Sequence, residues 1–225
     1  MKIGTTLGHE MVGRIERLGE GLTKDNAGNP VAIGDRIVAT YFQICNRCKP
    51  CMNGDHSMCE NTYEFFMKKP EVYPHFHGTF ATHYYVQPGQ HFFKVPDNIP
   101  NSVAVSANCA ISQVLYGLSK ANLSVNETVL IQGAGGLGLY SVAVAKASGA
   151  KVIIVDGVES RLNQAKEFGA DHLINLNEYK TVEERNKVIM DLTDGFGADV
   201  GIEVSGVPDA FSEGIHHIRR SGRYV

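Results

Sequence analysis

Apolar residues in the second half of the chain fall into short runs separated by segments of helical character. Five short apolar strands are predicted, at 128–132, 151–155, near 172–174, 199–204 and an incipient one at 222–225. Helices are predicted between them, for example at 159–168 and 181–193. Alternation of strand and helix is typical of a parallel, doubly wound sheet, so this half is expected to form an α/β domain.

The first hundred residues follow a different pattern, in which apolar and polar residues alternate and turn signals recur at short intervals. Strands are predicted at 11–18, 35–39, 79–86 and 91–95. The proline-bounded segment 96–100 ends this β-rich pattern, and helices rich in alanine begin shortly afterwards. The sequence therefore predicts two domains, 1–105 and 106–225.

A glycine-rich segment, which reads GAGGLG from Gly133 to Gly138, lies between the strand at 128–132 and a helix predicted at 140–147. Glycines in such a turn let a pyrophosphate approach the backbone N–H groups at a helix N-terminus. Asp156 ends the following strand, where a carboxylate can accept hydrogen bonds from the ribose hydroxyls of NAD. Strand, glycine loop, helix and acid together favour dinucleotide binding over an isolated glycine-rich turn.

Composition narrows the range of partners. The chain has 225 residues, is 43% hydrophobic and carries a formal net charge of −3, so it has no basic excess for binding a phosphate backbone. No apolar run reaches the length of a membrane span, and the first residues lack the apolar core of a signal peptide. We expect neither a nucleic-acid nor a membrane partner, and a cytoplasmic location.

Four of the five cysteines lie within fifteen residues, as Cys45-x2-Cys48-x2-Cys51-x7-Cys59. Four thiolates at this spacing can surround a tetrahedral Zn²⁺ with no open position, as a structural site requires. A bacterial ferredoxin motif differs, because its fourth cysteine follows after three residues. An iron–sulfur cluster and plain buried thiols remain alternatives. If zinc is bound, its removal should disorder about residues 43–62.

Two weaker signals flank the cysteine segment. Gly8-His9-Glu10 precedes the first predicted strand, and a fifth cysteine, Cys109, lies near the predicted domain boundary. Taken alone, His9-Glu10 would be interpreted as a surface pair and Cys109 as an ordinary buried cysteine.

Taken together and in this order, these features resemble the zinc-dependent medium-chain alcohol dehydrogenases, over residues 4–225. The resemblance implies a β-rich GroES-like catalytic domain followed by a Rossmann NAD-binding domain, both partial. It implies that His9 and Cys109 are two of three protein ligands of a catalytic zinc, with Glu10 beside the metal. Cys45, Cys48, Cys51 and Cys59 are then the structural zinc site.

The resemblance also assigns the nucleotide contacts. The expected cofactor-binding residues are Gly133, Gly135, Gly136, Leu137, Gly138, Asp156, Arg161, Val204 and Ser205. An acid at position 156 repels a 2′-phosphate, which favours NAD over NADP. Arg161 has an alternative interpretation as a solvated helix residue, and Val204-Ser205 as a simple strand-to-helix turn.

One family feature lies outside the sequence. In the family the first catalytic zinc ligand is a cysteine well upstream of the GHE motif, and the proton-relay groups lie near it. Here only eight residues precede His9, and the sequence stops as the fifth strand of the nucleotide domain begins. We therefore expect an internal fragment of a longer dehydrogenase, and the truncated chain can be inactive.

The leading hypothesis is an oxidoreductase that uses zinc-assisted hydride transfer between a primary or secondary alcohol and NAD. A zinc-free quinone reductase of the same fold is one alternative. A non-catalytic NAD- and zinc-binding fragment is another. The resemblance implies a small-molecule alcohol or carbonyl substrate, and a homodimeric or homotetrameric parent protein.

Overall fold

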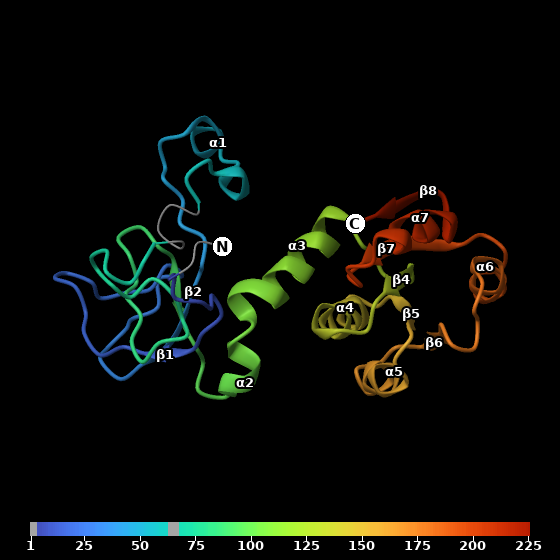
Figure 1. The fold of residues 1–225 in the computed structure, drawn as a ribbon, viewed down its shortest axis with the longest axis horizontal. Coiled ribbons are helices and arrows are strands. Elements are labelled where there is room, and N and C mark those ends of the chain that lie inside the picture. The colour runs from blue at the N-terminus through green and yellow to red at the C-terminus, as the bar shows by residue number, and fades with distance from the viewer. Residues whose placement is uncertain (1–3, 63–67) are drawn as a thin grey trace. The chain divides into compact units, whose positions relative to one another are not determined.

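A computed structural model describes residues 4–62 and 68–225 (Figure 1). The chain divides into two compact units, Met1–Cys109 and Ala110–Val225. Among the described residues, no helix combines the length and the apolar character that crossing a bilayer requires.

The first unit contains a three-stranded antiparallel sheet in the order β1-β2-β3. Its strands are β1 (Gly13–Arg14), β2 (Arg36–Ala39) and β3 (Phe92–Lys94). Along β2, Ile37 and Ala39 face one apolar cluster and Val38 faces another, as the alternation of a strand requires. The remaining elements are short: α1 (Lys49–Met52), η1 (His56–Met58) and α2 (Asn101–Ala104).

Two predicted strands of this unit need correction. The segment 11–18 forms a strand only at Gly13–Arg14, because the ladder turns away at Ile15, which bonds to the loop at Gly34 and Asp35. The segment 79–86 is not a strand. Thr79 and Phe80 donate their backbone N–H groups to the carbonyls of Gly8 and Leu7, in a stretch that bends at the positive-φ Gly8 and cannot continue a ladder.

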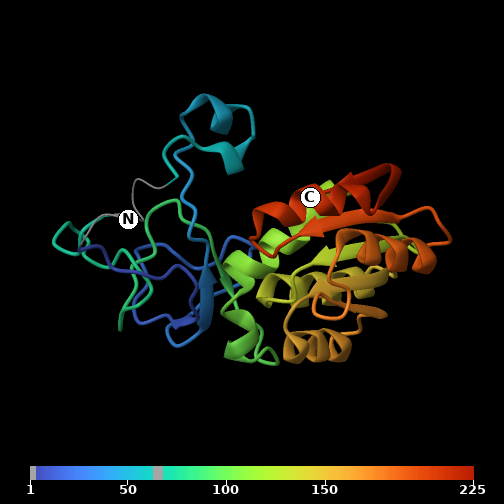
Figure 2. The same ribbon diagram turned by 45° about the vertical axis from the view of Figure 1, so that its right-hand side comes forward.

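The second unit is a five-stranded parallel sheet in the order β6-β5-β4-β7-β8 (Figure 2). Its strands are β4 (Thr128–Gln132), β5 (Lys151–Asp156), β6 (His172–Asn175), β7 (Ala198–Glu203) and β8 (Ile218–Tyr224). The order reverses between β4 and β7, as in a doubly wound dinucleotide-binding fold, so the predicted fold class is confirmed.

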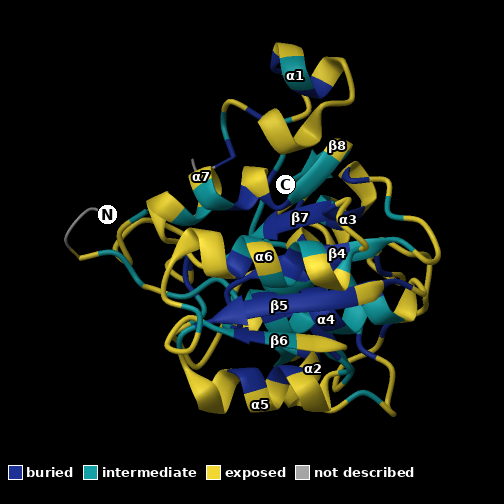
Figure 3. Cartoon of the chain, turned by 90° about the vertical axis from the view of Figure 1, so that its right-hand side faces the viewer, coloured by how far each residue is buried: buried dark blue, intermediate teal, exposed yellow. Residues whose placement is uncertain are grey.

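Helices cover both faces of this sheet. They are α3 (Ser112–Lys120), α4 (Gly136–Ala147), α5 (Glu159–Glu167), α6 (Val182–Leu192) and α7 (Pro208–His216). Val129 and Ile131 pack with α4 and α5 on one face, whereas Leu130 packs with α6 on the other. The central strands β4, β5 and β7 are buried on both sides, which explains their continuous apolar runs, whereas β8 at the edge of the sheet has no fully buried residue (Figure 3).

Two predicted boundaries in this unit are wrong. The helix expected from residue 140 begins at Gly136, so its first turn is part of the glycine-rich segment. The fifth strand begins at Ile218 rather than 222, and its pairing with β7 contains a register shift. Ser221, with φ of 60°, lies in this irregular stretch, where polar and glycine residues hide the strand from a periodicity analysis.

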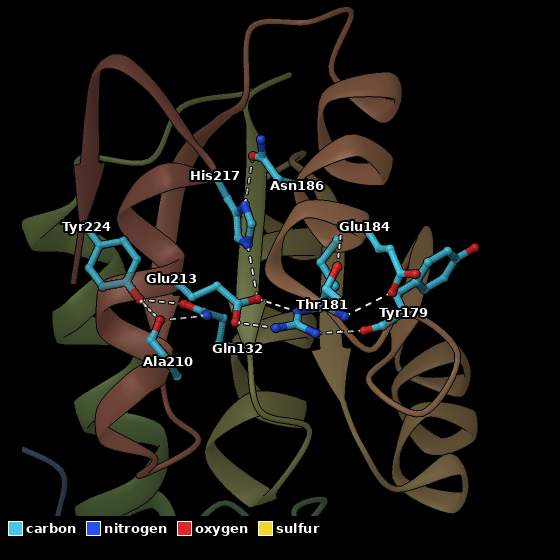
Figure 4. A network of polar contacts seen from close by, with 10 residues as sticks. Gln132, Tyr179, Thr181, Glu184, Asn186, Ala210, Glu213, His217 and Tyr224 are labelled. Atoms are coloured by element: carbon cyan, nitrogen blue, oxygen red, sulfur yellow. Dashed lines mark hydrogen bonds and ion pairs between the residues drawn. The ribbon is translucent and has the colours of Figure 1, made fainter.

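A largely buried polar network joins α6 to α7 and to His217, the C-cap residue of α7 (Figure 4). Arg185 forms a two-bond ion pair with Glu213, at 2.5 and 2.6 Å. His217, which is 1% exposed, lies 3.2 Å from the Glu213 carboxylate and 3.1 Å from the amide oxygen of Asn186. The Arg185 hydrogen bond holds the pKa of Glu213 below its ordinary value, whereas burial lowers the pKa of His217.

Candidate functional site: two metal clusters and a nucleotide loop

Three potential metal donors from distant parts of the sequence meet in the first unit. His9 and Glu10 lie in the loop before β1, and Cys109 lies in the π-helical turn η2 (Ala107–Ile111). One donor atom from each of the three lies within 4.8 Å of the others. His9 Nε2 is 3.2 Å from Cys109 Sγ.

The local backbone explains why a glycine precedes His9. Gly8 has φ of 90°, a conformation that side-chain-bearing residues rarely adopt. A Cβ at this position would lie 2.5 Å from Thr79 Oγ1 and 2.6 Å from the Phe80 ring. Thr79 in turn donates a backbone N–H to the Gly8 carbonyl and its hydroxyl to the Glu10 carbonyl. The 79–80 segment therefore supports the loop that carries the two donors.

Sulfur, nitrogen and oxygen donors together suit a borderline cation such as Zn²⁺. Burial raises the pKa of the Cys109 thiol, and the neighbouring Glu10 carboxylate raises it further. A bound cation acts in the opposite direction, because a coordinating thiol is deprotonated. The residues present therefore fit a metal ion.

Two neighbours of this cluster were missed by the sequence analysis. Asn108 donates its side-chain N–H groups to the backbone carbonyls of His9 and Ala39, at 2.7 and 2.8 Å. The ring of Tyr41 lies 4.8 Å from that of His9. Asn108 directly precedes Cys109, but adjacency in sequence did not show that its side chain binds His9.

The four clustered cysteines form a second group of donors. Their sulfur atoms lie within 4.8 Å of one another, and Cys45 Sγ is 4.0 Å from Cys51 Sγ. Two thiolates bound tetrahedrally to one zinc at 2.3 Å each would be about 3.8 Å apart. All five cysteines of the chain are free thiols. The spacing therefore fits a single tetrahedral ion.

Polar groups around this cluster support negative charge on some sulfurs. The backbone N–H of Arg47 and the side-chain amide of Asn61 lower the pKa of Cys45 to about 6. Burial raises the pKa of Cys51 well above its usual range. Four adjacent thiols in such different settings cannot all ionise on their own, so a cation is the natural counter-charge for this lobe.

The glycine loop of the second unit is built by close backbone contacts. Gly133 has φ of 101°, and a Cβ on it would lie 2.7 Å from the Ser205 Cα. A Cβ on Gly138 would lie 1.9 Å from the Gly133 carbonyl oxygen. These two glycines are required by the fold itself, because the strand, the loop and the first turn of α4 touch without side chains between them.

Gly135 and Gly136 differ, because no described atom lies within 4 Å of the Cβ position of either. Gly135 is the N-cap of α4, and no side chain caps this end among the described residues. The first N–H groups of the helix are thus left for an anionic ligand such as a pyrophosphate. Leu137, in the same turn, packs against the sheet core.

Asp156 ends β5 and is 8% exposed. One carboxylate oxygen accepts the backbone N–H of Ala134 at 2.7 Å, and the other accepts that of Val158 at 2.8 Å. A carboxylate has about four acceptor positions, so acceptor capacity remains for ribose hydroxyls. Arg161 is exposed in the first turn of α5, in the same part of the unit.

Val204 and Ser205 follow β7, at the carboxyl edge of the sheet. Val204 donates its backbone N–H to the Gln132 carbonyl, and Ser205 closes against Gly133. The structure thus brings these residues beside the glycine loop, where parallel sheets of this type bind ligands.

Comparison with known proteins gives one consistent answer. The family described as "Alcohol dehydrogenase GroES-like domain" matches residues 1–97, and the family described as "Zinc-binding dehydrogenase" matches residues 136–225. The chain is 36% identical over 222 residues to 5-exo-hydroxycamphor dehydrogenase of Pseudomonas putida, covering 97% of the chain and 60% of that protein. It is 38% identical to L-threonine 3-dehydrogenase of Pyrococcus furiosus, with 96% and 57% covered.

A solved structure of an alcohol dehydrogenase from Thermotoga maritima matches with a TM-score of 0.91 and 35% identity. This match covers 98% of the chain and 61% of the other protein. The chain therefore spans about 60% of the length of the proteins that it resembles.

Proposed function

The chain belongs to the zinc-dependent medium-chain alcohol dehydrogenases, and from this premise we propose that it carries the metal and nucleotide sites of an NAD-dependent oxidoreductase. The proposed reaction interconverts a primary or secondary alcohol and its carbonyl compound. One observation carries the proposal: His9, Glu10 and Cys109 lie within 4.8 Å of one another, although Cys109 is 100 positions from His9 in the sequence. A zinc-free reductase of the same fold has no need of such a cluster.

In this proposal His9 and Cys109 hold a catalytic zinc, with Glu10 as a neighbouring or exchangeable ligand. Such a metal acts as a Lewis acid toward the oxygen of an alcohol or carbonyl compound. The protein's part is to fix the ligands: the Gly8 turn sets His9 and Glu10, and the π-helical turn presents Cys109. All four donors of the cysteine cluster are needed to complete one tetrahedral ion, so this cluster is proposed as the structural zinc site.

A nicotinamide cofactor supplies the hydride-transfer chemistry. The open N-terminus of α4 and Gly135 receive the pyrophosphate, and Asp156 receives the adenosine ribose. A 2′-phosphate would meet the negative charge of Asp156, so we propose NAD as the cofactor. Arg161, Val204 and Ser205 are proposed to border the bound nucleotide.

Cysteine usage supports a cytoplasmic location in the same proposal. The five free thiols, four of them gathered as metal donors, are typical of a reducing compartment.

Elemental analysis of zinc in the purified 225-residue chain tests the metal sites directly. Two zinc ions per chain are expected, falling to one in a Cys109→Ser variant. One zinc in the unmodified chain would contradict the catalytic site, and none in a folded chain would contradict both sites. An alcohol-dependent rise of NADH absorbance, on a panel of primary and secondary alcohols, then separates an enzyme from a non-catalytic NAD- and zinc-binding chain.

A further inference from the structure

Asn108 has a buried side-chain amide that donates both of its N–H groups to backbone carbonyls of other segments. Its Nδ2 atom donates to the His9 carbonyl at 2.7 Å and to the Ala39 carbonyl at 2.8 Å. Because both partners are acceptors, only the orientation with the nitrogen toward them satisfies the geometry. One side chain therefore joins the donor loop, the end of β2 and the π-helical turn.

Two consecutive residues thus hold His9 at two different points. Asn108 binds its carbonyl, while Cys109 Sγ lies 3.2 Å from its ring nitrogen Nε2. Both side chains come from η2, and single π-helical turns are frequent at functional sites. The separation of the His9 and Cys109 donor atoms therefore depends on the amide contact that fixes the His9 main chain.

Side-chain volume alone does not explain an asparagine here. Its Oδ1 atom is buried and has no hydrogen-bond partner among the described residues. A buried acceptor without a partner costs about 1–3 kcal/mol. A leucine of similar size would avoid that cost but would leave the His9 and Ala39 carbonyls without these donors, so what distinguishes asparagine here is its two N–H groups.

We propose that Asn108 is a positioning residue for the His9–Glu10–Cys109 centre. Its amide holds His9 and Cys109 at the separation that a metal ion needs before the ion binds. The inference rests on the proposed function for the identity of that centre. Asn108 acts through His9 and need not touch metal or substrate.

Zinc affinity of the full chain provides the test, measured by competition with a chromophoric chelator. Asn108→Ala and Asn108→Leu are compared with Asn101→Ala, a control in which an exposed amide loses its bond to Arg36. Loss of groups that orient metal ligands typically weakens metal binding about 10- to 100-fold. We expect both Asn108 variants to bind zinc at the His9–Glu10–Cys109 centre about 10- to 100-fold more weakly than the wild type, and we expect the control to keep wild-type affinity.

The four-cysteine site serves as an internal standard. Tight binding of zinc at the four cysteines in every variant shows that the cysteine lobe is folded, and an unchanged circular dichroism spectrum shows the same of the rest of the chain. Cobalt substitution adds a second readout: the absorption bands of cobalt bound to Cys109 should change in the Asn108 variants even at saturating metal, because ligand geometry changes.

The outcomes distinguish failure of the positioning role of Asn108 from failure of the proposed metal centre. Wild-type affinity and spectrum in Asn108→Leu would overturn the positioning role, because they would show that only side-chain volume matters. A wild-type chain that binds two zinc ions, with both Asn108 variants equal to it, would also overturn it and leave the proposed function standing. A wild-type chain that binds one zinc would contradict both.

Discussion

Each of the two units of the chain is stabilised internally by a different kind of interaction. The second unit has a continuous apolar core, in which Val129, Leu130 and Ile131 are fully buried, and it adds the Arg185–Glu213 ion pair. In the first unit the sheet strands are two to four residues long, and the buried cluster of the cysteine lobe consists of cysteines. We therefore expect packing to sustain the second unit, and we expect the cysteine lobe to depend on a bound ion.

Metal removal should produce the largest effect and tests this contrast first. Binding of zinc to structural sites is worth about 10–16 kcal/mol in small peptides, so a chelator should abolish amide-exchange protection across residues 43–62. Strands β4 and β5 should keep their protection, because their bonds do not involve the lobe. Hydrogen exchange read by mass spectrometry measures both. Cys109→Ser is the control, since it should leave the lobe protected; a lobe that stays protected without zinc would contradict the contrast.

Breaking the ion pair should be the next largest effect and should be confined to the second unit. Arg185→Met leaves the half-buried Glu213 carboxylate without its guanidinium partner and with only His217 beside it, so the loss should approach but not exceed the about 3–5 kcal/mol of a fully buried broken pair. Urea unfolding followed by circular dichroism measures the loss, and zinc content should not change. Adding Glu213→Leu should recover much of it, because the pair is then removed rather than broken. Equal stability of Arg185→Met and wild type would show that the network contributes little.

Two glycine substitutions separate folding from ligand binding in the same loop. In Gly138→Ala the new Cβ meets the Gly133 carbonyl at 1.9 Å, so the loop must shift, at about 1–3 kcal/mol. In Gly135→Ala no described atom is within 4 Å, so the only expected loss of stability is the smaller one of replacing a glycine N-cap by alanine, below about 1 kcal/mol. NAD affinity measured by calorimetry should nevertheless fall about tenfold, because the Cβ occupies the space where the pyrophosphate approaches. Unchanged NAD affinity in Gly135→Ala would argue against the proposed pyrophosphate position.

The smallest expected effect is a pH dependence of the free energy of unfolding of the second unit. Burial lowers the pKa of His217, so the unfolded state binds a proton more readily than the folded state. Stability should fall as pH drops below the ordinary histidine pKa of 6.5, and level off below the folded pKa. The slope is at most about 1.4 kcal/mol per pH unit. Urea unfolding from pH 7.5 to 5 should show this slope reduced in His217→Asn and retained in His216→Asn, a change at an exposed neighbour.

The features that could be predicted from sequence are local ones. Strands β4, β5 and β7 were predictable because they are buried on both faces and read as continuous apolar runs, which β8 is not. The four cysteines signalled their cluster through spacing alone. The strand predicted at 79–86 does not form, because alternation of apolar and polar residues does not guarantee a neighbouring segment with the regular backbone that a ladder needs.

Features that depend on distant pairs were harder to foresee. His9 and Cys109 were linked only through family resemblance, since 100 positions separate them. Asn108 gave no signal, because its role depends on a carbonyl 99 positions away. The Arg185–Glu213–His217 network was likewise invisible, since each residue alone is typical of a helix surface.

Asp156 has a consequence for attempts to change cofactor preference. The carboxylate proposed to recognise the ribose also accepts the backbone N–H groups of Ala134 and Val158. A neutral or shortened side chain, introduced to admit a 2′-phosphate, would release one N–H of the glycine loop and one at the start of α5. The same side chain therefore determines both cofactor selectivity and the structure of the glycine loop. Redesign toward NADP should begin at the exposed positions around Arg161 rather than at Asp156.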